Sequence, residues 1–231
     1  IIVATTQALK MHGGVQLTDI KKPNAEGLIS GLANLDKHIE NMKSFGQNVL
    51  VTLNKYGFDT DEEINLVKTH CEKHNVGFAV NKSFADGGKG AEALAHEVVR
   101  MIDETPSKPL QYTYDKSDSI EKKIEKVAKQ IYGAASVEFK GKAAKKVKQF
   151  SETIAKEYQV CIAKTQYSFS DDATAYGVSK DFTLTINDIV LNNGAEFLVA
   201  IAGSIMRMPG LPADPQARRI DLVNGEIEGL S

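Results

Sequence analysis

Residues 49–63 read VLVTLNKYGFDTDEE, and this stretch decides the fold class. Its first five residues form a continuous apolar run, which is typical of a buried strand. Thr60 and Glu63 have the spacing of a capping box, which predicts that a helix begins directly after the intervening loop. A buried strand, a short loop and a helix form the first part of a β-α-β unit, so the stretch predicts a parallel sheet.

The same order of elements recurs further along the chain. The helix that starts at Asp61 is followed by a predicted strand over 78–80, a helix over 91–103 and a third strand over 110–114. A helix over 120–132 follows. Repeated units of this kind require right-handed crossovers and cover both faces of a parallel sheet. The predicted fold class is therefore α/β, with a parallel-sheet, Rossmann-like domain and flanking helices.

The composition changes after Gly133, where the chain becomes richer in strand signals. The predicted elements are strands over 137–139, 160–164, 182–186 and 197–202, a helix over 142–158, and a hairpin that pairs 220–222 with 226–227 around Asn224-Gly225. These elements predict a smaller α+β domain over 133–231 that follows an α/β domain over 35–132. Ile1–Thr5 resembles a buried strand already under way, so residues 1–34 are predicted to be the tail end of a truncated domain.

Charge and cysteine content narrow the class of protein. The 231 residues carry a formal net charge of -2, which predicts no general attraction to nucleic acid or to an anionic membrane. No apolar run approaches the roughly 18 residues of a membrane span. Cys71 and Cys161 lie far apart on periodic or apolar segments, which favours reduced thiols in a cytoplasmic protein.

Two aromatic residues follow two of the predicted strands. Tyr56 lies in the loop NKYGFDT (54–60) and Phe84 in the loop NKSFADGGKG (81–90). Ligands of open parallel sheets bind outside the carboxyl ends of the strands, so the two side chains can converge on one flat ligand. The alternative is that both rings only pack against the protein.

Several long strings closely resemble one family over essentially the whole chain. They are Ala4-Thr5 with ALKMHGG (8–14), AKTQYS (163–168) with SDD (170–172), KDFTLT (180–185), and Met206 with MPGLP (208–212). The family is formate–tetrahydrofolate ligase, and the chain resembles its C-terminal part from the last strand of the large nucleotide-binding domain onward.

The resemblance implies an activity and its small-molecule substrates. Members use ATP with Mg²⁺ to phosphorylate formate, and then transfer the formyl group to N10 of tetrahydrofolate. They are commonly homotetramers. The resemblance also implies that Tyr56 and Phe84 hold the pterin-like ring, with Gly57, Gly87 and Gly88 in the same two loops. Family members often have Phe-Pro and Trp at these places, so Tyr56-Gly57 and Phe84 are departures that keep the aromatic faces.

Two further segments are candidates for the active site. Lys10, His12, Gly13 and Gly14 follow the opening strand and are predicted to border the nucleotide or formyl phosphate, although a structural linker explains them nearly as well. Leu211 and Pro212 are a candidate active-site loop, with a packed interdomain turn as the alternative.

The phosphate-binding loop G-x-x-x-x-G-K-[ST] does not occur in the 231 residues. The catalytic residues are therefore expected upstream of residue 1, and the chain alone is predicted to be inactive. A non-catalytic folate-binding module and a structural or assembly domain are the alternatives. His70 and His74 have a zinc-like spacing, but no third ligand is visible in the sequence, so no metal site is predicted.

Overall fold

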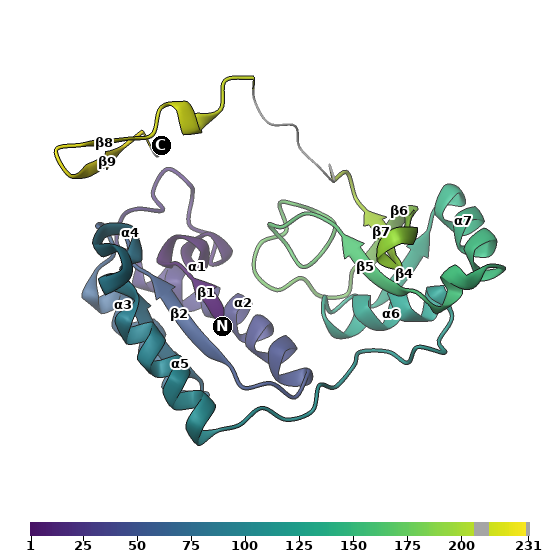
Figure 1. Cartoon of the computed structure of the whole chain (residues 1–231), viewed down its shortest axis with the longest axis horizontal. Coiled ribbons are helices and arrows are strands. Elements are labelled where there is room, and N and C mark those ends of the chain that lie inside the picture. The colour runs from purple at the N-terminus through teal and green to yellow at the C-terminus, as the bar shows by residue number, and fades with distance from the viewer. Residues whose placement is uncertain (206–212, 230–231) are drawn as a thin grey trace.

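A three-stranded parallel sheet forms the N-terminal part of the computed structural model, which describes residues 1–205 and 213–229 (Figure 1). In spatial order its strands are β1 (Ile2–Ala4), β2 (Leu50–Asn54) and β3 (Gly77–Asn81). Val51 pairs with Ile2 on one side and with Phe78 on the other. The parallel sheet predicted from the stretch 49–63 is confirmed.

The helices of this part come between and after the strands. They are α1 (Thr6–His12), α2 (Ala25–Ser44), α3 (Asp61–Lys73), the short α4 (Ser83–Asp86) with the 3₁₀ turn η1 (Gly87–Ala91), and α5 (Glu92–Glu104). Thr60 caps α3 by accepting a hydrogen bond of 3.2 Å from the backbone nitrogen of Glu63, as the capping box predicts.

Helices α2 and α3 bury their apolar sides together with β1 and β2. This core contains Leu28 and Leu35 from α2, Val67 and Cys71 from α3, and Val51 from β2. The opposite face of the sheet is not covered throughout, since Val3 in β1 is 66% exposed. The predicted cover on both faces is therefore only partly present among the described residues.

A second sheet lies in the C-terminal part and is mixed. Its strands run in the order β4 (Ser136–Phe139), β6 (Thr183–Asn192), β7 (Phe197–Ala202) and β5 (Gln159–Ala163). Only the central pair, β6 and β7, is antiparallel. Helices α6 (Ile120–Gln130) and α7 (Gly141–Ser151) pack with it into a second core. This part therefore combines two helices with a mixed sheet. Its core includes α6, which the predicted division placed with residues 35–132.

The remaining elements are short. They are the 3₁₀ turns η2 (Ile154–Glu157), η3 (Asn193–Ala195) and η4 (Gln216–Arg218), and the hairpin strands β8 (Asp221–Val223) and β9 (Glu226–Glu228). Asn224 and Gly225 have φ of 51° and 86°, which fits the type I′ turn that Asn-Gly predicts. The predicted helix over 142–158 was too long, because α7 ends at Ser151 and only η2 follows.

The predicted third strand over 110–114 is wrong. The residues there pair with no strand, and Leu110 and Tyr112 are 53% and 79% exposed. Pro106 and Pro109 lack the backbone donors that a sheet needs. The backbone nitrogen of Gln111 donates instead to the carbonyl oxygen of Phe45 at 3.0 Å, and the side chain of Gln47 donates to the carbonyl oxygen of Lys108, just before the segment, at 3.2 Å.

Helix α2 was not predicted at all. Its signals are Asn24, which accepts a hydrogen bond of 2.8 Å from the backbone nitrogen of Gly27, and an apolar stripe of Leu28, Leu32 and Leu35. Among the described residues, none of the helices has the length and apolar character to span a membrane.

Candidate functional site

Three aromatic rings gather at the carboxyl ends of β2 and β3. The ring centroids of Tyr56 and Phe84 are 5.9 Å apart with an angle of 50° between the planes. Phe58 stacks on Tyr56, with ring centroids 5.6 Å apart and an angle of 4° between the planes. The convergence of Tyr56 and Phe84 agrees with the geometry inferred from the sequence, whereas Phe58 was missed although it lies in the same loop.

A buried carboxylate holds the loop that carries Tyr56. Asp59 is 7% exposed, and its Oδ2 accepts a hydrogen bond of 2.8 Å from the backbone nitrogen of Tyr56. The hydroxyl of Thr6, at the start of α1, donates to Oδ1 of the same carboxylate. Asp59 thus connects the loop to α1, and the backbone of Tyr56 is positioned by an element that follows a different strand.

The two rings contact each other in this arrangement and leave no room for a third ring between them. Carbon atoms in contact are about 3.5–4.0 Å apart, so a planar ligand held on both faces needs roughly 7 Å between the aromatic planes. Phe84 is the more exposed of the two: it is 62% exposed on the four-residue helix α4, whereas Tyr56 is half-buried.

The glycines of the two loops leave open space beside the rings. A Cβ atom built on Gly57, Gly87 or Gly88 would meet nothing within 4 Å. Gly87 also has φ of 58°, a conformation that side-chain-bearing residues rarely adopt. The backbone is therefore accessible at all three positions, which is compatible with close approach of a ligand.

Lys10 makes a buried ion pair. Its Nζ lies 3.0 Å from Oε1 of Glu63, and the two side chains are 0% and 2% exposed. The ammonium group also donates to the carbonyl oxygen of Lys22 at 2.9 Å. The ammonium group of Lys10 is therefore paired inside the fold and does not face solvent.

Gly13 and His12 lie at the end of α1, in different surroundings. A Cβ atom on Gly13 would lie 1.8 Å from the carbonyl oxygen of Gly27, so this residue is in close backbone contact with α2. The Nδ1 atom of His12 accepts a hydrogen bond of 3.0 Å from the backbone nitrogen of Gly177, which belongs to the C-terminal part. Gly14, with φ of 88°, is exposed.

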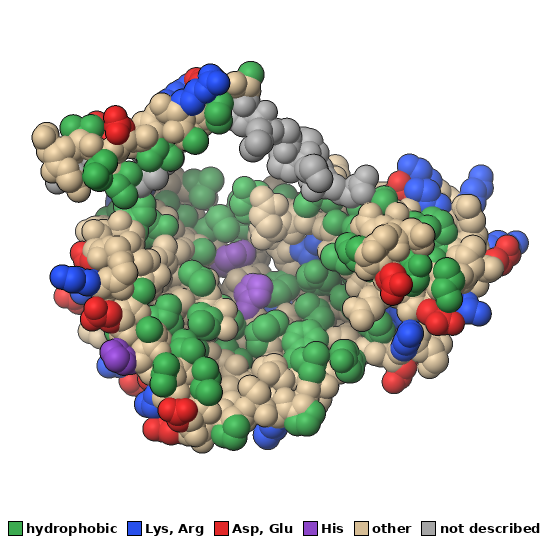
Figure 2. Space-filling view, viewed as in Figure 1, with side chains coloured by type: hydrophobic (Ala, Val, Ile, Leu, Met, Phe, Trp, Pro, Cys, Tyr) green, Lys and Arg blue, Asp and Glu red, His purple; other side chains and the backbone are tan. Residues whose placement is uncertain are grey.

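His12 also lines a cavity of about 270 Å³ between the two parts of the chain. Histidine side chains are visible in the central hollow of Figure 2. Lys164 lines the same cavity, and burial lowers its pKa to about 8. Its Nζ lies 4.9 Å from the centre of the Tyr132 ring and donates to the carbonyl oxygen of Thr165 at 2.9 Å. Desolvation likewise lowers the pKa of His12 and of His38.

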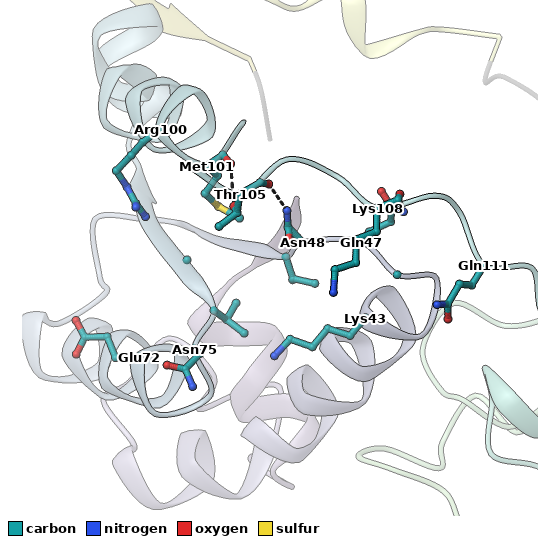
Figure 3. Close-up of a pocket in the computed structure, with 14 residues that line it drawn as sticks. Lys43, Gln47, Asn48, Glu72, Asn75, Arg100, Met101, Thr105, Lys108 and Gln111 are labelled. Carbon is teal, nitrogen blue, oxygen red and sulfur yellow. Dashed lines mark hydrogen bonds between the residues drawn. The ribbon is translucent and has the colours of Figure 1, made fainter. Parts of the chain in front are cut away.

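A larger cavity, of about 660 Å³, lies at the opposite end of the first sheet (Figure 3). It is lined by Val49 and Gly77, which flank the amino ends of β2 and β3, and by the end of α5. Ligands of parallel sheets bind at the carboxyl ends, so its position favours a surface hollow over a substrate site.

The structure brings together some of the predicted site residues and separates others. Tyr56 and Phe84 come together at the carboxyl ends of β2 and β3, and Gly57, Gly87 and Gly88 lie in the same two loops. Lys10 and Gly13 are packed inside the fold, and His12 faces a separate cavity. Leu211 and Pro212 lie outside the described residues.

A family model and individual relatives identify the same family. The model of the family described as formate–tetrahydrofolate ligase matches residues 1–231. A formate–tetrahydrofolate ligase of Parabacteroides distasonis is 59% identical over the whole chain, and those of Bacteroides fragilis and Petrotoga mobilis are 57% and 47% identical. In each case the chain spans 42% of the length of the relative.

Proposed function

We propose that this chain, which belongs to the formate–tetrahydrofolate ligase family, supplies the folate-binding half of an ATP-dependent ligase. The whole reaction would join formate to tetrahydrofolate through formyl phosphate and release ADP and phosphate. The observation that supports the folate role is the aromatic cluster of Tyr56 and Phe84 at the carboxyl ends of β2 and β3, with Phe58 stacked on Tyr56.

The pterin-like ring would enter between Tyr56 and Phe84. Phe84 would move away from Tyr56, and the ligand would replace the present ring contact with two stacking contacts. Tyr56 would stay in place, because Phe58 stacks on it and Asp59 holds its backbone. The open backbone at Gly57 and Gly88 would let the polar edge of the ring approach the two loops.

Removing both aromatic faces should weaken tetrahydrofolate binding without unfolding the chain. In the variant Tyr56→Ala/Phe84→Ala we expect a loss of about 1–3 kcal/mol of binding free energy for each ring, since that is the usual value of stacking a base-like ring on an aromatic side chain. Titration of tetrahydrofolate by calorimetry measures the loss. Tyr112→Ala is the matched control, because Tyr112 is 79% exposed and lies far along the chain from both loops.

A structural role of the three rings is the rival function, and their present mutual packing favours it. In that case the double variant would bind tetrahydrofolate as the parent does and would lose thermal stability instead. Equal affinities of parent and double variant, with a folded variant, would therefore reject the folate role.

For the border of the nucleotide or formyl phosphate site, we assign His12 and Gly14 rather than Lys10 and Gly13. Lys10 and Gly13 are used in packing α1 against its neighbours, whereas His12 lines a cavity and Gly14 is exposed. Mg²⁺ and the ATP phosphates are assigned to the part of the relatives that this chain does not cover, because phosphoryl transfer needs a phosphate-cradling loop that the 231 residues lack.

The chain alone should make no 10-formyltetrahydrofolate from ATP, formate and tetrahydrofolate. Without a phosphate loop it has no means to neutralise the charge on the transferring phosphoryl group. A spectrophotometric assay of formyl transfer, with a complete relative as the positive control, measures this. Turnover that depends on both ATP and formate would contradict the proposed division of labour.

A further inference from the structure

Three potential metal ligands from two helices converge at the outer side of the first core. They are Asp36 on α2, His70 in the last turn of α3, and His74 at its C-cap. Each offers one ligand atom, and these atoms all lie within 4.8 Å of one another. The two histidines have a helical i, i+4 spacing, and the third ligand that the sequence did not reveal comes from 34 residues away.

The ligand atoms of the cluster lie close enough to one another to share a cation. Oδ1 of Asp36 lies 2.6 Å from Nε2 of His70, and the rings of His70 and His74 have centroids 4.5 Å apart. Ligand atoms around one tetrahedral Zn²⁺ ion lie about 2.0–2.2 Å from the metal, and therefore about 3.3–3.6 Å from one another. An ion would separate Oδ1 of Asp36 from Nε2 of His70 by side-chain rotation, and water would complete the tetrahedron.

The donor set selects the kind of metal. Two imidazoles and one carboxylate favour borderline ions such as Zn²⁺, Co²⁺, Ni²⁺ and Cu²⁺, whereas Mg²⁺ prefers oxygen ligands alone. The side chain of His70 is 18% exposed and that of Asp36 32% exposed, so an ion can enter from solvent without opening the core.

The surrounding charges set a limit on the affinity. The ammonium group of Lys43 donates to the carbonyl oxygen of His74 at 3.1 Å and opposes a bound cation. Lys37 is partly neutralised by Glu40 at 3.8 Å, and Lys68 by Glu72 at 3.9 Å. In the other direction, the carboxyl end of α3 carries a negative dipole charge that attracts a cation. These terms predict moderate rather than very tight binding.

We propose that Asp36, His70 and His74 form a binding site for Zn²⁺ that fastens α2 to α3. The ion replaces the hydrogen bond between Asp36 and His70 by a link through three ligands. Because it binds the folded chain and not the unfolded one, it stabilises the packing of the two helices. The site lies apart from the aromatic loops and does not depend on the folate role.

Calorimetric titration of the purified protein with Zn²⁺ tests the site, in a Cys161→Ser background that removes the exposed thiol as a competing ligand. The parent should bind one ion. His74→Ala and Asp36→Asn should each weaken binding at least about tenfold, as expected when a three-ligand site loses one ligand. His96→Ala, which changes an exposed histidine of α5 outside the cluster, should bind like the parent.

Two further measurements separate loss of the site from loss of the fold. In EDTA, Asp36→Asn should melt like the parent, because asparagine can still accept the hydrogen bond from His70, and Zn²⁺ should raise the melting temperature of the parent only. Co²⁺ should give the visible absorption of a tetrahedral complex in the parent and not in folded Asp36→Asn. Parent-like affinity in folded His74→Ala and Asp36→Asn would overturn the proposal.

Discussion

Lys10→Met is expected to lower the free energy of unfolding by about 3–5 kcal/mol, because it leaves the carboxylate of Glu63 buried without its charge partner. The side chains of the pair are 0% and 2% exposed, so water cannot replace the ammonium group. Urea unfolding monitored by circular dichroism measures the change. Lys22→Met is the matched control: its ion pair with Asp19 is 74% and 51% exposed, and such pairs contribute at most about 1 kcal/mol.

The effect of Lys10→Met should also depend on pH. Burial by itself raises the pKa of Glu63, but the backbone nitrogen of Asn24 and the ammonium group of Lys10 outweigh it and hold the pKa below the usual 4.5. A carboxyl group whose pKa is lowered in the folded state stabilises the protein fully at pH values above its ordinary pKa of 4.5. This stabilisation is lost as the pH falls through the pKa of the folded state. The difference between parent and variant should therefore shrink in acid.

Replacing both partners gives the decisive comparison. Lys10→Met/Glu63→Gln removes both charges together, so it should be more stable than Lys10→Met alone. If Lys10→Met has the same free energy of unfolding as the parent at neutral pH, the buried pair does not stabilise the fold. Lys10 would then again be a candidate for the border of the nucleotide or formyl phosphate site.

Gly31→Ala should destabilise the protein by about 3 kcal/mol, the upper part of the range for overpacked sites. A Cβ atom on Gly31 would lie 1.8 Å from the carbonyl oxygen of Leu9 and 3.1 Å from the backbone nitrogen of Gly13. Both neighbours are backbone atoms that cannot rotate away, so α1 and α2 must separate. In an exposed helix the same substitution stabilises by up to about 1 kcal/mol, so the expected sign is opposite to that of helix propensity.

Gly141→Ala is the control for Gly31→Ala. Gly141 is exposed in the first turn of α7, and a Cβ atom there would meet nothing within 4 Å. Chemical unfolding of the two variants should therefore give changes of opposite sign. A Gly31→Ala variant as stable as the parent would show that α1 and α2 do not approach as closely as the structure places them. Because α1 also donates from Thr6 to Asp59, its displacement should loosen the loop of Tyr56 and lower tetrahydrofolate affinity as well.

The elements that could be predicted from the sequence are those whose causes are local. The strand and loop of residues 49–63 are read from an apolar run, and the start of α3 from the cap of Thr60. The Asn224-Gly225 turn likewise depends on the conformations open to two residues. The segment 110–114 has the residue types of a strand, but strand formation also needs a neighbour with free backbone groups, and that is not a local property.

The packing role of the glycines in α2 cannot be read from the sequence. Gly27 and Gly31 lower helix propensity, and their purpose becomes apparent only in the folded chain, where Val15 packs against Gly27 and the backbone of Leu9 in α1 packs against Gly31. Lys164 lay in a string that carried the family resemblance, yet its lowered pKa arises from burial in the cavity between the two parts. Asp36 is one of many surface acids until α3 places His70 beside it.

The sequence by itself determined the class of the first sheet, the family, and the presence of Tyr56 and Phe84 at neighbouring strand ends. These follow from hydrophobic period, capping chemistry and long matching strings. Only the tertiary structure decided which charges pair and which side chains meet: Lys10 with Glu63 and Thr6 with Asp59 across 53 residues, and Asp36 with His70 across 34. The physical reason is that such contacts are set by how α1, α2 and α3 pack on the sheet, and packing depends on shape over the whole core rather than on the order of residues along one segment.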